Sequence, residues 1–409
     1  MSITLPHRST ALLALLTVLP LTHTWAGGLW ISEFGAPAMG RAGAGAEAGV
    51  NDASTGLYNP ASMTRLDTSQ FMATGGFAWS QIEFESTRTS LLTGNEDGGD
   101  AGSVAPAASA FYVRPLNERW WFGMNFYGVT GSALDYKNNW VGRFQATDVE
   151  LVFLGLQPTI GYKVNDHLSI GAGVLLGYTK MELTVAVPNL TNPLTGPPGS
   201  ATVDGDDTEI GFTLGAMLTL SPNTRLGLIY QSDLDSSYSG DVELSPSDAS
   251  VGVDADLPLA ALARLALTHQ FNPNLAAHLT VGWEDWDTLD ALLLTTESAG
   301  VVAKRNWDDT YHYAGGISYR LSDQWAVQGG VSYDTNPADK EFRTADLPVD
   351  RQVRYAIGGK YTRASGAEIA AHLVYADYGR SRIDSTGFAG DYKSNDIVFF
   401  SVSYNWGKN

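Results

Sequence analysis

A run of acids between two tryptophans, Trp283-Glu284-Asp285-Trp286-Asp287, is the first candidate for chemistry in this chain. Two carboxyl groups at a suitable separation can cleave a glycosidic bond, one acting as the acid. The run also ends a stretch of alternating apolar and polar residues, where an interfacial aromatic pair followed by loop acids is the simpler interpretation. We favour that interpretation, and no Gly-x-Ser-x-Gly elbow indicates a nucleophile.

Histidines offer a second kind of chemistry, metal binding. His269 and His278 flank one predicted turn, but His269 shares its face with Leu265 while His278 alternates with Leu279. Because successive strand residues point to opposite faces, we expect no shared ion and predict no metal site. His312 lies between two tyrosines on a predicted lumen face, where a pore-lining polar group is favoured over a catalytic base.

Nucleotide and calcium motifs are weak here. Residues 43–48 (GAGAEA) match the dinucleotide glycine pattern, but no buried strand precedes them and no βαβ unit follows. The acidic runs 95–100 and 204–207 lack the full calcium-loop pattern and are read as solvated loops. We therefore predict no cofactor and no enzyme activity.

Composition further narrows the class of protein to which the chain could belong. The chain of 409 residues has 44 acidic and 25 basic side chains, a net charge of −19, which argues against nucleic acid as a partner. It has no cysteine and hence no disulfide framework. Its 44 glycines and many aromatic residues are typical of sheets, tight turns and interfacial girdles.

The elements that must position these residues are strands with two unlike faces. One face of the stretch 168–179 is apolar, with Ile170 and Val174, and the other is mostly small or polar, with Ser169 and Thr179. That is the period of two of a β-strand. The pattern recurs fourteen times, at about 69–82, 103–114, 119–129, 150–164, 167–187, 208–221, 223–236, 251–271, 274–290, 307–321, 324–335, 351–364, 367–380 and 392–406.

The connections and the start of the chain indicate where such a sheet would lie. Short polar turns alternate with long polar loops, and residues 1–26 read as an export signal with Arg8, an apolar stretch at 11–21 and a small-x-small site at 24–26. We predict an all-β, fourteen-stranded antiparallel transmembrane barrel over 69–409, multi-pass in the bacterial outer membrane and facing lipid and lipopolysaccharide. Aromatic residues near strand ends fit the membrane interfaces: Trp120, Trp121, Trp325, Tyr333, Tyr404 and Trp406.

Residues 27–68 differ from the rest. From Gly35 to Gly49, eleven of fifteen residues are glycine or alanine, so the segment cannot form a core of its own. It is either a disordered leader or an N-terminal hatch (a plug) inside the lumen. A barrel wide enough to hold water favours the plug.

Three groups of motifs then resemble the FadL/TodX-type outer-membrane transport proteins, which carry long-chain fatty acids or aromatic hydrocarbons. They cover nearly the whole mature chain: Glu33-Phe34-Gly35, Gly40-Arg41-Ala42, Asn51-Asp52-Ala53-Ser54 and Asn59-Pro60-Ala61; Trp140-Val141-Gly142-Arg143-Phe144 and Tyr162-Lys163-Val164-Asn165; Trp307-Asp308-Asp309-Thr310, Tyr333-Asp334 and Asp350-Arg351.

The resemblance implies passive, porin-like passage of hydrophobic small molecules through a plugged barrel, with a sideways exit at a kinked strand. Glycine, proline or a bulge can interrupt a ladder, so the kink is expected either in strand 103–114, at Pro106, or in strand 119–129, at Gly123 or Gly128. Fatty acids and smaller hydrocarbons both remain candidate substrates.

Site residues follow from the same resemblance. Ligand contacts are expected from six residues, and a hatch-holding role from a tripeptide. The ligand-binding set is Leu29, Trp30, Phe34, Tyr178, Lys180 and Lys304, with the two lysines near a carboxylate headgroup, and the hatch motif is Asn59, Pro60 and Ala61. We expect a monomer. The alternative function is a general diffusion porin for small polar solutes, which would need no leader segment.

Overall fold

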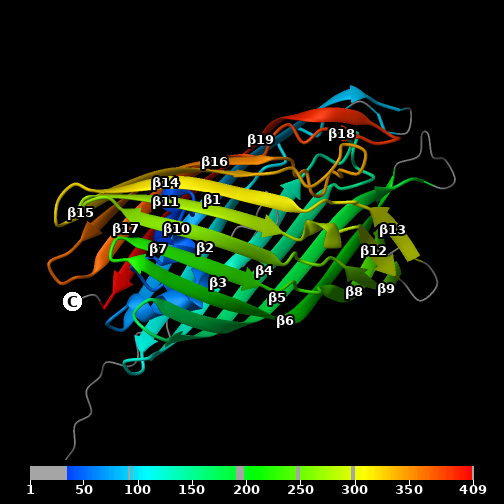
Figure 1. Ribbon diagram of the computed structural model, residues 1–409. Helices are drawn as coiled ribbons and strands as arrows, with labels where there is room; N and C mark the ends of the chain where they lie inside the picture. The colour runs from blue at the N-terminus through cyan, green and yellow to red at the C-terminus, as the bar shows by residue number, and fades with distance from the viewer. Residues whose placement is uncertain are drawn as a thin grey trace, which may run out of the picture.

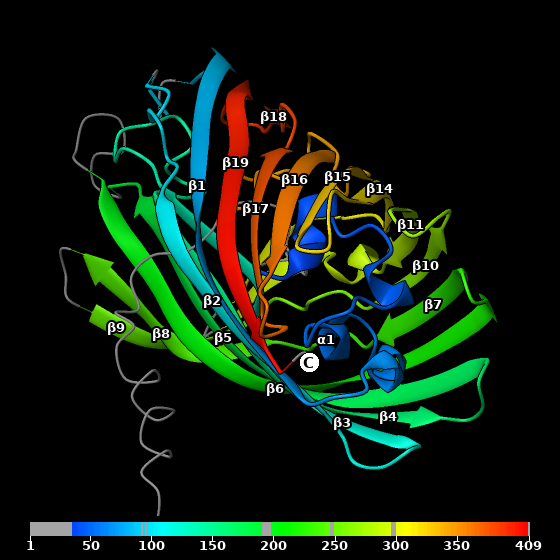
Figure 2. The same ribbon diagram turned by 90° about the vertical axis from the view of Figure 1, so that its left-hand side faces the viewer.

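The first and last strands close one antiparallel sheet into a barrel (Figure 1, Figure 2). In the computed structural model, which describes residues 35–90, 93–94, 96–189, 198–245, 249–295 and 300–407, β1 (Gln70–Arg88) pairs with both β2 (Val104–Pro115) and β19 (Ala389–Trp406). The remaining strands are β3 (Trp120–Asp135), β4 (Asp148–Lys163), β5 (Leu168–Val187), β6 (Gly199–Ser221), β7 (Thr224–Gln231), β8 (Ser237–Ser245), β9 (Ala249–Asp256), β10 (Leu262–Gln270), β11 (Leu275–Glu284), β12 (Ala291–Thr295), β13 (Gly300–Lys304), β14 (Thr310–Arg320), β15 (Trp325–Asp334), β16 (Gln352–Thr362), β17 (Glu368–Asp377) and β18 (Ile383–Asp384).

These numbered segments make up fourteen barrel strands, because several barrel strands are interrupted and carry two numbers each. β7 and β8 both pair with β6, one after the other. β9 and β10, β11 and β12, and β13 and β14 likewise form interrupted strands, since β10 pairs with β7 and β11 while β9 pairs with β8 and β12. The two-residue β18 only extends the edge of β19. The prediction of a fourteen-stranded antiparallel barrel is confirmed.

The predicted strands are too short at one end. Stretches that the sequence placed in long loops continue the sheet: β6 starts at Gly199, so the acidic run 204–207 lies in a strand and not in a solvated loop. The hairpins β8–β9 and β12–β13 also extend it. Each extension is paired along both edges or with its own hairpin partner, and backbone pairing does not require an apolar face.

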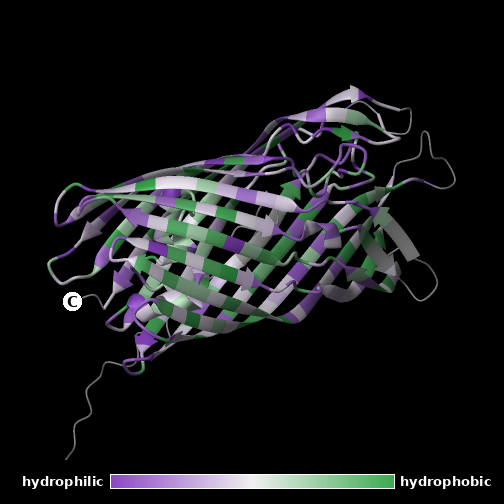
Figure 3. Cartoon of the chain, in the orientation of Figure 1, coloured by the Kyte–Doolittle hydropathy of each residue, from purple (hydrophilic) through white to green (hydrophobic). Residues whose placement is uncertain are grey.

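The outer face of the barrel is apolar over the middle of the strands, where Figure 3 shows mostly green and white residues, with purple gathered toward the ends. On β5, Ile170 and Val174 are each 46% exposed, whereas Ser169 and Thr179 on the other face are buried. A closed sheet with paired strands satisfies backbone hydrogen bonds without water, as lipid requires. One aromatic prediction is wrong: Trp121 is buried on the lumen side and donates to the carbonyl of Leu66.

Inside the barrel lies the hatch segment, here the described residues 35–66, drawn in blue within the ring of strands (Figure 2). It holds four short helices: η1 (Pro37–Arg41), η2 (Ala46–Ala48), α1 (Thr55–Tyr58) and η3 (Pro60–Arg65). A further one, η4 (Trp286–Thr288), lies between β11 and β12. None of the helices in the described residues is long and apolar enough to cross a membrane. The predicted signal at 1–26 lies outside the described residues.

The hatch segment is rich in glycine because its backbone touches the barrel wall directly. A Cβ on Gly40 would lie 2.8 Å from Cα of Gly358, so only glycine fits on either side of this contact. Across the lumen, a Cβ on Gly227 would lie 1.9 Å from the carbonyl oxygen of Glu47. Close approach of two backbones is the property that glycine supplies.

Candidate ligand cavity, hatch contacts and wall gap

Asn59 ties the hatch segment to itself and to the wall. Its Nδ2 donates to the carbonyl of Glu47 at 2.8 Å and to that of Ala216 on β6 at 3.0 Å, while its Oδ1 accepts from the backbone N–H of Ala61 at 3.0 Å. The residue is completely buried. Pro60 starts η3, where a missing N–H costs nothing. These contacts support the predicted holding role of Asn59, Pro60 and Ala61.

A buried ionic network joins the same segment to the opposite wall. Glu47 in η2 lies 3.8 Å from Arg264 on β10, and Arg264 pairs with Glu284 on β11 at 3.0 Å. Thr280 on β11 also donates to Glu47 at 3.1 Å. All three charged side chains are buried, so each charge depends on its partners for stabilisation. The hatch segment is therefore held by charge as well as by packing.

An apolar cavity lies on the lumen side of β4 and β5, where the space between the side chains, open solvent included, amounts to about 310 Å³. Its apolar walls come from two continuous strands, from β12 and from two connecting segments: Val149, Leu151, Met181, Leu183, Leu257, Leu292 and Leu347. Two polar residues complete the lining, Arg305 and Asp346. Such a space, mostly apolar with few polar groups, is typical of a small-molecule site.

Arg305 and Asp346 form a paired charge at the edge of this cavity. Nη1 of Arg305 donates to Oδ1 of Asp346 at 3.0 Å and Nη2 donates to Oδ2, so the ion pair is bidentate. Nη1 also donates to the Thr344 hydroxyl. Burial raises the pKa of Asp346, but the positive charge and hydrogen bonds of Arg305 and the hydrogen bond from Thr344 outweigh it, so the pKa is lowered overall. Asp346 is thus held as an anion against the guanidinium.

The barrel wall has a gap beside the cavity. Within the described residues, the β2–β3 ladder runs only from Ala110–Phe126 to Pro115–Trp121, and Val104–Ser109 of β2 pair with β1 alone. β3 continues on β4, with a register shift between Gly128 and Gly131. Such a bulge bends a strand and ends local pairing.

The cavity and the gap are neighbours in the register of the sheet. Leu151 and Val149, which line the cavity, are the β4 partners of Ser132 and Leu134 on the part of β3 that lacks a β2 partner. Of the three expected kink positions, Pro106, Gly123 and Gly128, the one at Gly128 coincides with the interruption. Pro106 lies on the facing edge of β2, a position that proline tolerates because it has no N–H to donate.

A family model described as outer membrane protein transport protein (OMPP1/FadL/TodX) matches residues 17–403. The chain belongs to this family. Membership confirms the predictions of a transport protein of the bacterial outer membrane and not an enzyme.

Individual proteins of the family resemble the chain over most of its length. The Long-chain fatty acid transport protein of Escherichia coli O6:H1 is 24% identical over 403 residues, covering 89% of this chain and 90% of that protein. Outer membrane protein P1 of Haemophilus influenzae (strain Rd) is 23% identical over 412 residues, covering 89% of each.

Solved structures show the same fold. The crystal structure of a Pseudomonas aeruginosa FadL homologue superposes with a TM-score of 0.85 at 24% identity, covering 93% of this chain and 99% of that one. The P. putida toluene transporter TodX gives a TM-score of 0.71 at 18% identity, with the same coverage.

Against this family background, the structure does not bring the predicted barrel-wall ligand residues to the cavity. Tyr178 is 41% exposed on the outer face of β5, and Lys180 on the same face pairs with Glu182 and with Asp204, each at 3.5 Å. Lys304 is exposed at the end of β13. Their ligand contacts stay predictions that this geometry does not support, and Leu29, Trp30 and Phe34 lie outside the described residues.

Residues adjacent to the two lysines occupy the places that were expected of Lys180 and Lys304. Met181 follows Lys180 and points into the cavity, and Arg305 follows Lys304 and is 2% exposed there. A shift of one residue along a strand reverses the face. Sequence reasoning missed Asp346 altogether, because nothing periodic in the 336–350 segment indicates which of its side chains turns inward.

The remaining chemical candidates separate by face. His269 bonds to Thr224 at 2.9 Å, whereas His278 is buried in the lumen and bonds to Thr268 at 3.1 Å, which confirms that they do not share a face. His312 is buried in the lumen and its Nδ1 lies 2.6 Å from Asp334.

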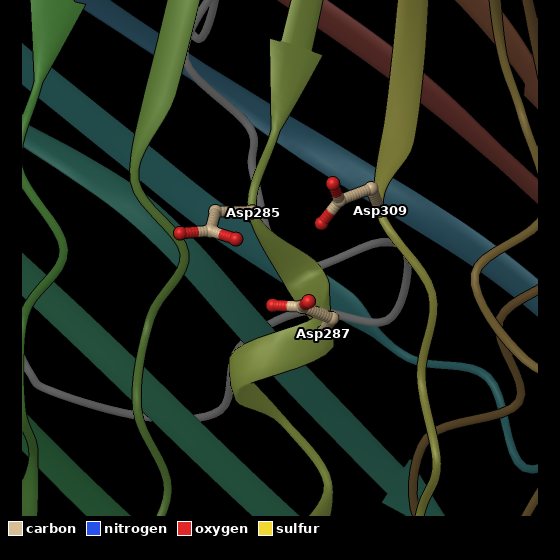
Figure 4. A group of neighbouring side chains, drawn as sticks. All are labelled: Asp285, Asp287 and Asp309. Atoms are coloured by element: carbon tan, nitrogen blue, oxygen red, sulfur yellow. The ribbon is translucent and has the colours of Figure 1, made fainter.

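The acidic side chains at the end of β11 and just after it point to two different places. Glu284 turns inward to Arg264, while Asp285, Asp287 and Asp309 form a separate group whose oxygens lie within 4.8 Å of one another (Figure 4). Nε1 of Trp283 donates to Asp309 at 2.8 Å. Burial, the hydrogen bond with Asp287 and the neighbouring carboxylates raise the pKa of Asp285 to about 6. Glu284 and Asp285 therefore do not converge on one substrate, and the three aspartates alone assign no function.

Proposed function

We propose that the protein carries hydrophobic compounds across the outer membrane passively, through the apolar cavity and out sideways at the gap between β2 and β3. One observation supports this most: the cavity-lining residues Val149 and Leu151 pair directly with the part of β3 that has no β2 neighbour. A molecule leaving the cavity therefore reaches the edge of the wall without crossing a water-filled pore.

The physical chemistry favours such a route for apolar molecules. Moving a methylene out of water is favourable by about 0.8 kcal/mol, so a greasy solute in a wet channel would be held back. An apolar cavity and a lateral exit keep it out of water throughout. Long-chain fatty acids and aromatic hydrocarbons are the candidate substrates, since similar proteins are named as a long-chain fatty acid transport protein and a toluene transporter.

Below the cavity the hatch segment closes the bore. We propose that Asn59, Pro60 and Ala61 keep it seated, while Leu29, Trp30 and Phe34 remain predicted ligand contacts. The outer apolar band would face lipid and lipopolysaccharide, and a monomer remains the expected state. The transport step needs no cofactor, because transfer follows the concentration gradient.

Transport into liposomes tests the proposal. Protein reconstituted in lipid vesicles should accelerate uptake of labelled oleate or toluene and leave sucrose outside. Uptake of sucrose with no effect on either apolar compound would overturn the proposal and favour the porin alternative. A variant lacking residues 27–68 serves as a control, because its ion conductance should be large while that of the intact protein is small.

A further inference from the structure

We propose that Asp346 is a specificity-determining residue that makes the cavity select neutral hydrophobic molecules over carboxylates. This inference rests on the proposed function and narrows its substrate class. It concerns the cavity lined by Leu151, Leu183 and Leu347, with Arg305 and Asp346 as its polar edge.

The polar edge of the cavity is formed by one cation and one anion, Arg305 and Asp346. Arg305 is the cation among the residues that line the cavity, and its guanidinium already holds Asp346 with two hydrogen bonds. Arg305 is 2% exposed and Asp346 7% exposed, so water does little to screen either charge. The edge is therefore a paired dipole with no net charge.

A carboxylate ligand meets a penalty at such an edge. To reach the guanidinium it would have to share it with Asp346, which places two negative charges within a few ångströms of each other in apolar surroundings. Two carboxyl groups at such a short distance resist being ionised at the same time. Desolvating a further ion, without a free counter-charge, adds to that cost.

A neutral molecule meets no such penalty, because it brings no second negative charge to the guanidinium. The ligand's apolar part would lie against the leucine walls.

Calorimetric titration of the full-length protein, exchanged into amphipol at pH 8, tests the inference with three probes of equal chain length: decan-1-ol, decanoate and decane. The wild type should bind decan-1-ol at least tenfold more tightly than decanoate. In Asp346→Asn, which frees the Arg305 charge, decanoate affinity should rise at least tenfold while that for decan-1-ol changes less than threefold.

Asp350→Asn is the matched control, because Asp350 lies in the same segment, 3.8 Å from Arg343, and does not line the cavity. It should leave all three affinities unchanged. If Asp346→Asn fails to fold, the wild-type ratio of decan-1-ol to decanoate decides alone.

The outcomes separate the two proposals. Decanoate binding as tightly as decan-1-ol in the wild type overturns the selectivity inference and leaves transport of hydrophobic compounds standing. Binding of none of the three probes overturns both.

Discussion

The eight barrel strands from β3 to β13/β14 divide into two halves that differ in continuity. From β3 to β6 the strands run unbroken for 16 to 23 residues, whereas the next four strands, from β7/β8 to β13/β14, are each interrupted. The continuous half supplies a flat apolar backing to the cavity through β4 and β5.

The interrupted half supplies cavity-lining residues that do not lie on continuous strands. Leu257 and Arg305 lie in the breaks themselves, where the chain leaves the sheet and turns into the lumen. Regular pairing builds the wall, and the departures from it build the site, because a side chain in a ladder can only face straight in or straight out.

The largest expected effect concerns the charge network of the interrupted half. Arg264→Met would leave Glu47 and Glu284 buried without their cation, a loss of about 3–5 kcal/mol in the free energy of unfolding. Denaturant unfolding measures it. Lys163→Met, at an exposed ion pair with Asp166 in the continuous half, should change stability by less than about 0.5 kcal/mol. Equal losses would mean that the network does not hold the interrupted half.

The second prediction concerns the bulge in β3 of the continuous half, beside the gap. Two residues of β3 oppose one residue of β4 between Gly128 and Gly131, so deleting Thr130 should restore the register and straighten the strand. Uptake of the apolar compound should fall at least tenfold, while equilibrium binding in the cavity stays within about twofold.

Deleting Lys393, the extra residue opposite β1 near Glu83, is its control, because it removes a bulge from β19, on the other edge of β1. That variant should transport normally. Normal transport after the Thr130 deletion would contradict the lateral route.

A third, smaller effect tests face parity on β4. Leu151→Phe should fill part of the cavity and weaken ligand binding by about three- to tenfold, with little change in stability, because the added volume enters space that is empty. Leu156→Phe, on the 40% exposed outer face, should change neither. Titration calorimetry and thermal unfolding on both variants give the comparison, and equal affinities would place the ligand elsewhere.

The smallest effect concerns the break after β11. Because the pKa of Asp285 is raised to about 6, its contribution to stability is full below about pH 4 and is lost as the pH rises through 6. Asp285→Asn should therefore raise the melting temperature by a degree or two, roughly, at pH 8 and leave it unchanged at pH 4. Asp256→Asn, at an exposed aspartate outside this cluster, is the matched control at both pH values. A gain of equal size at both values would rule out the shared carboxylate environment.

Part of the candidate site could be predicted from the sequence. The alternation that places Ile170 and Val174 outward also places Tyr178 and Lys180 outward, so their expected contact with a ligand in the lumen came from family resemblance and not from periodicity. The hatch tripeptide was recognisable because Asn59, Pro60 and Ala61 act locally, through a cap and a helix start.

By itself the sequence determined the strand number, the two alternating faces of the predicted strands and the presence of a glycine-rich segment before the barrel. These depend on interactions that repeat every two residues or lie within one turn, which composition and spacing record. Only the tertiary structure decided that Arg305 meets Asp346, that β3 leaves β2 after Phe126, and that the cavity adjoins that gap. Those contacts join segments far apart in the chain where the ladder is broken, and no local pattern encodes which broken ends will meet.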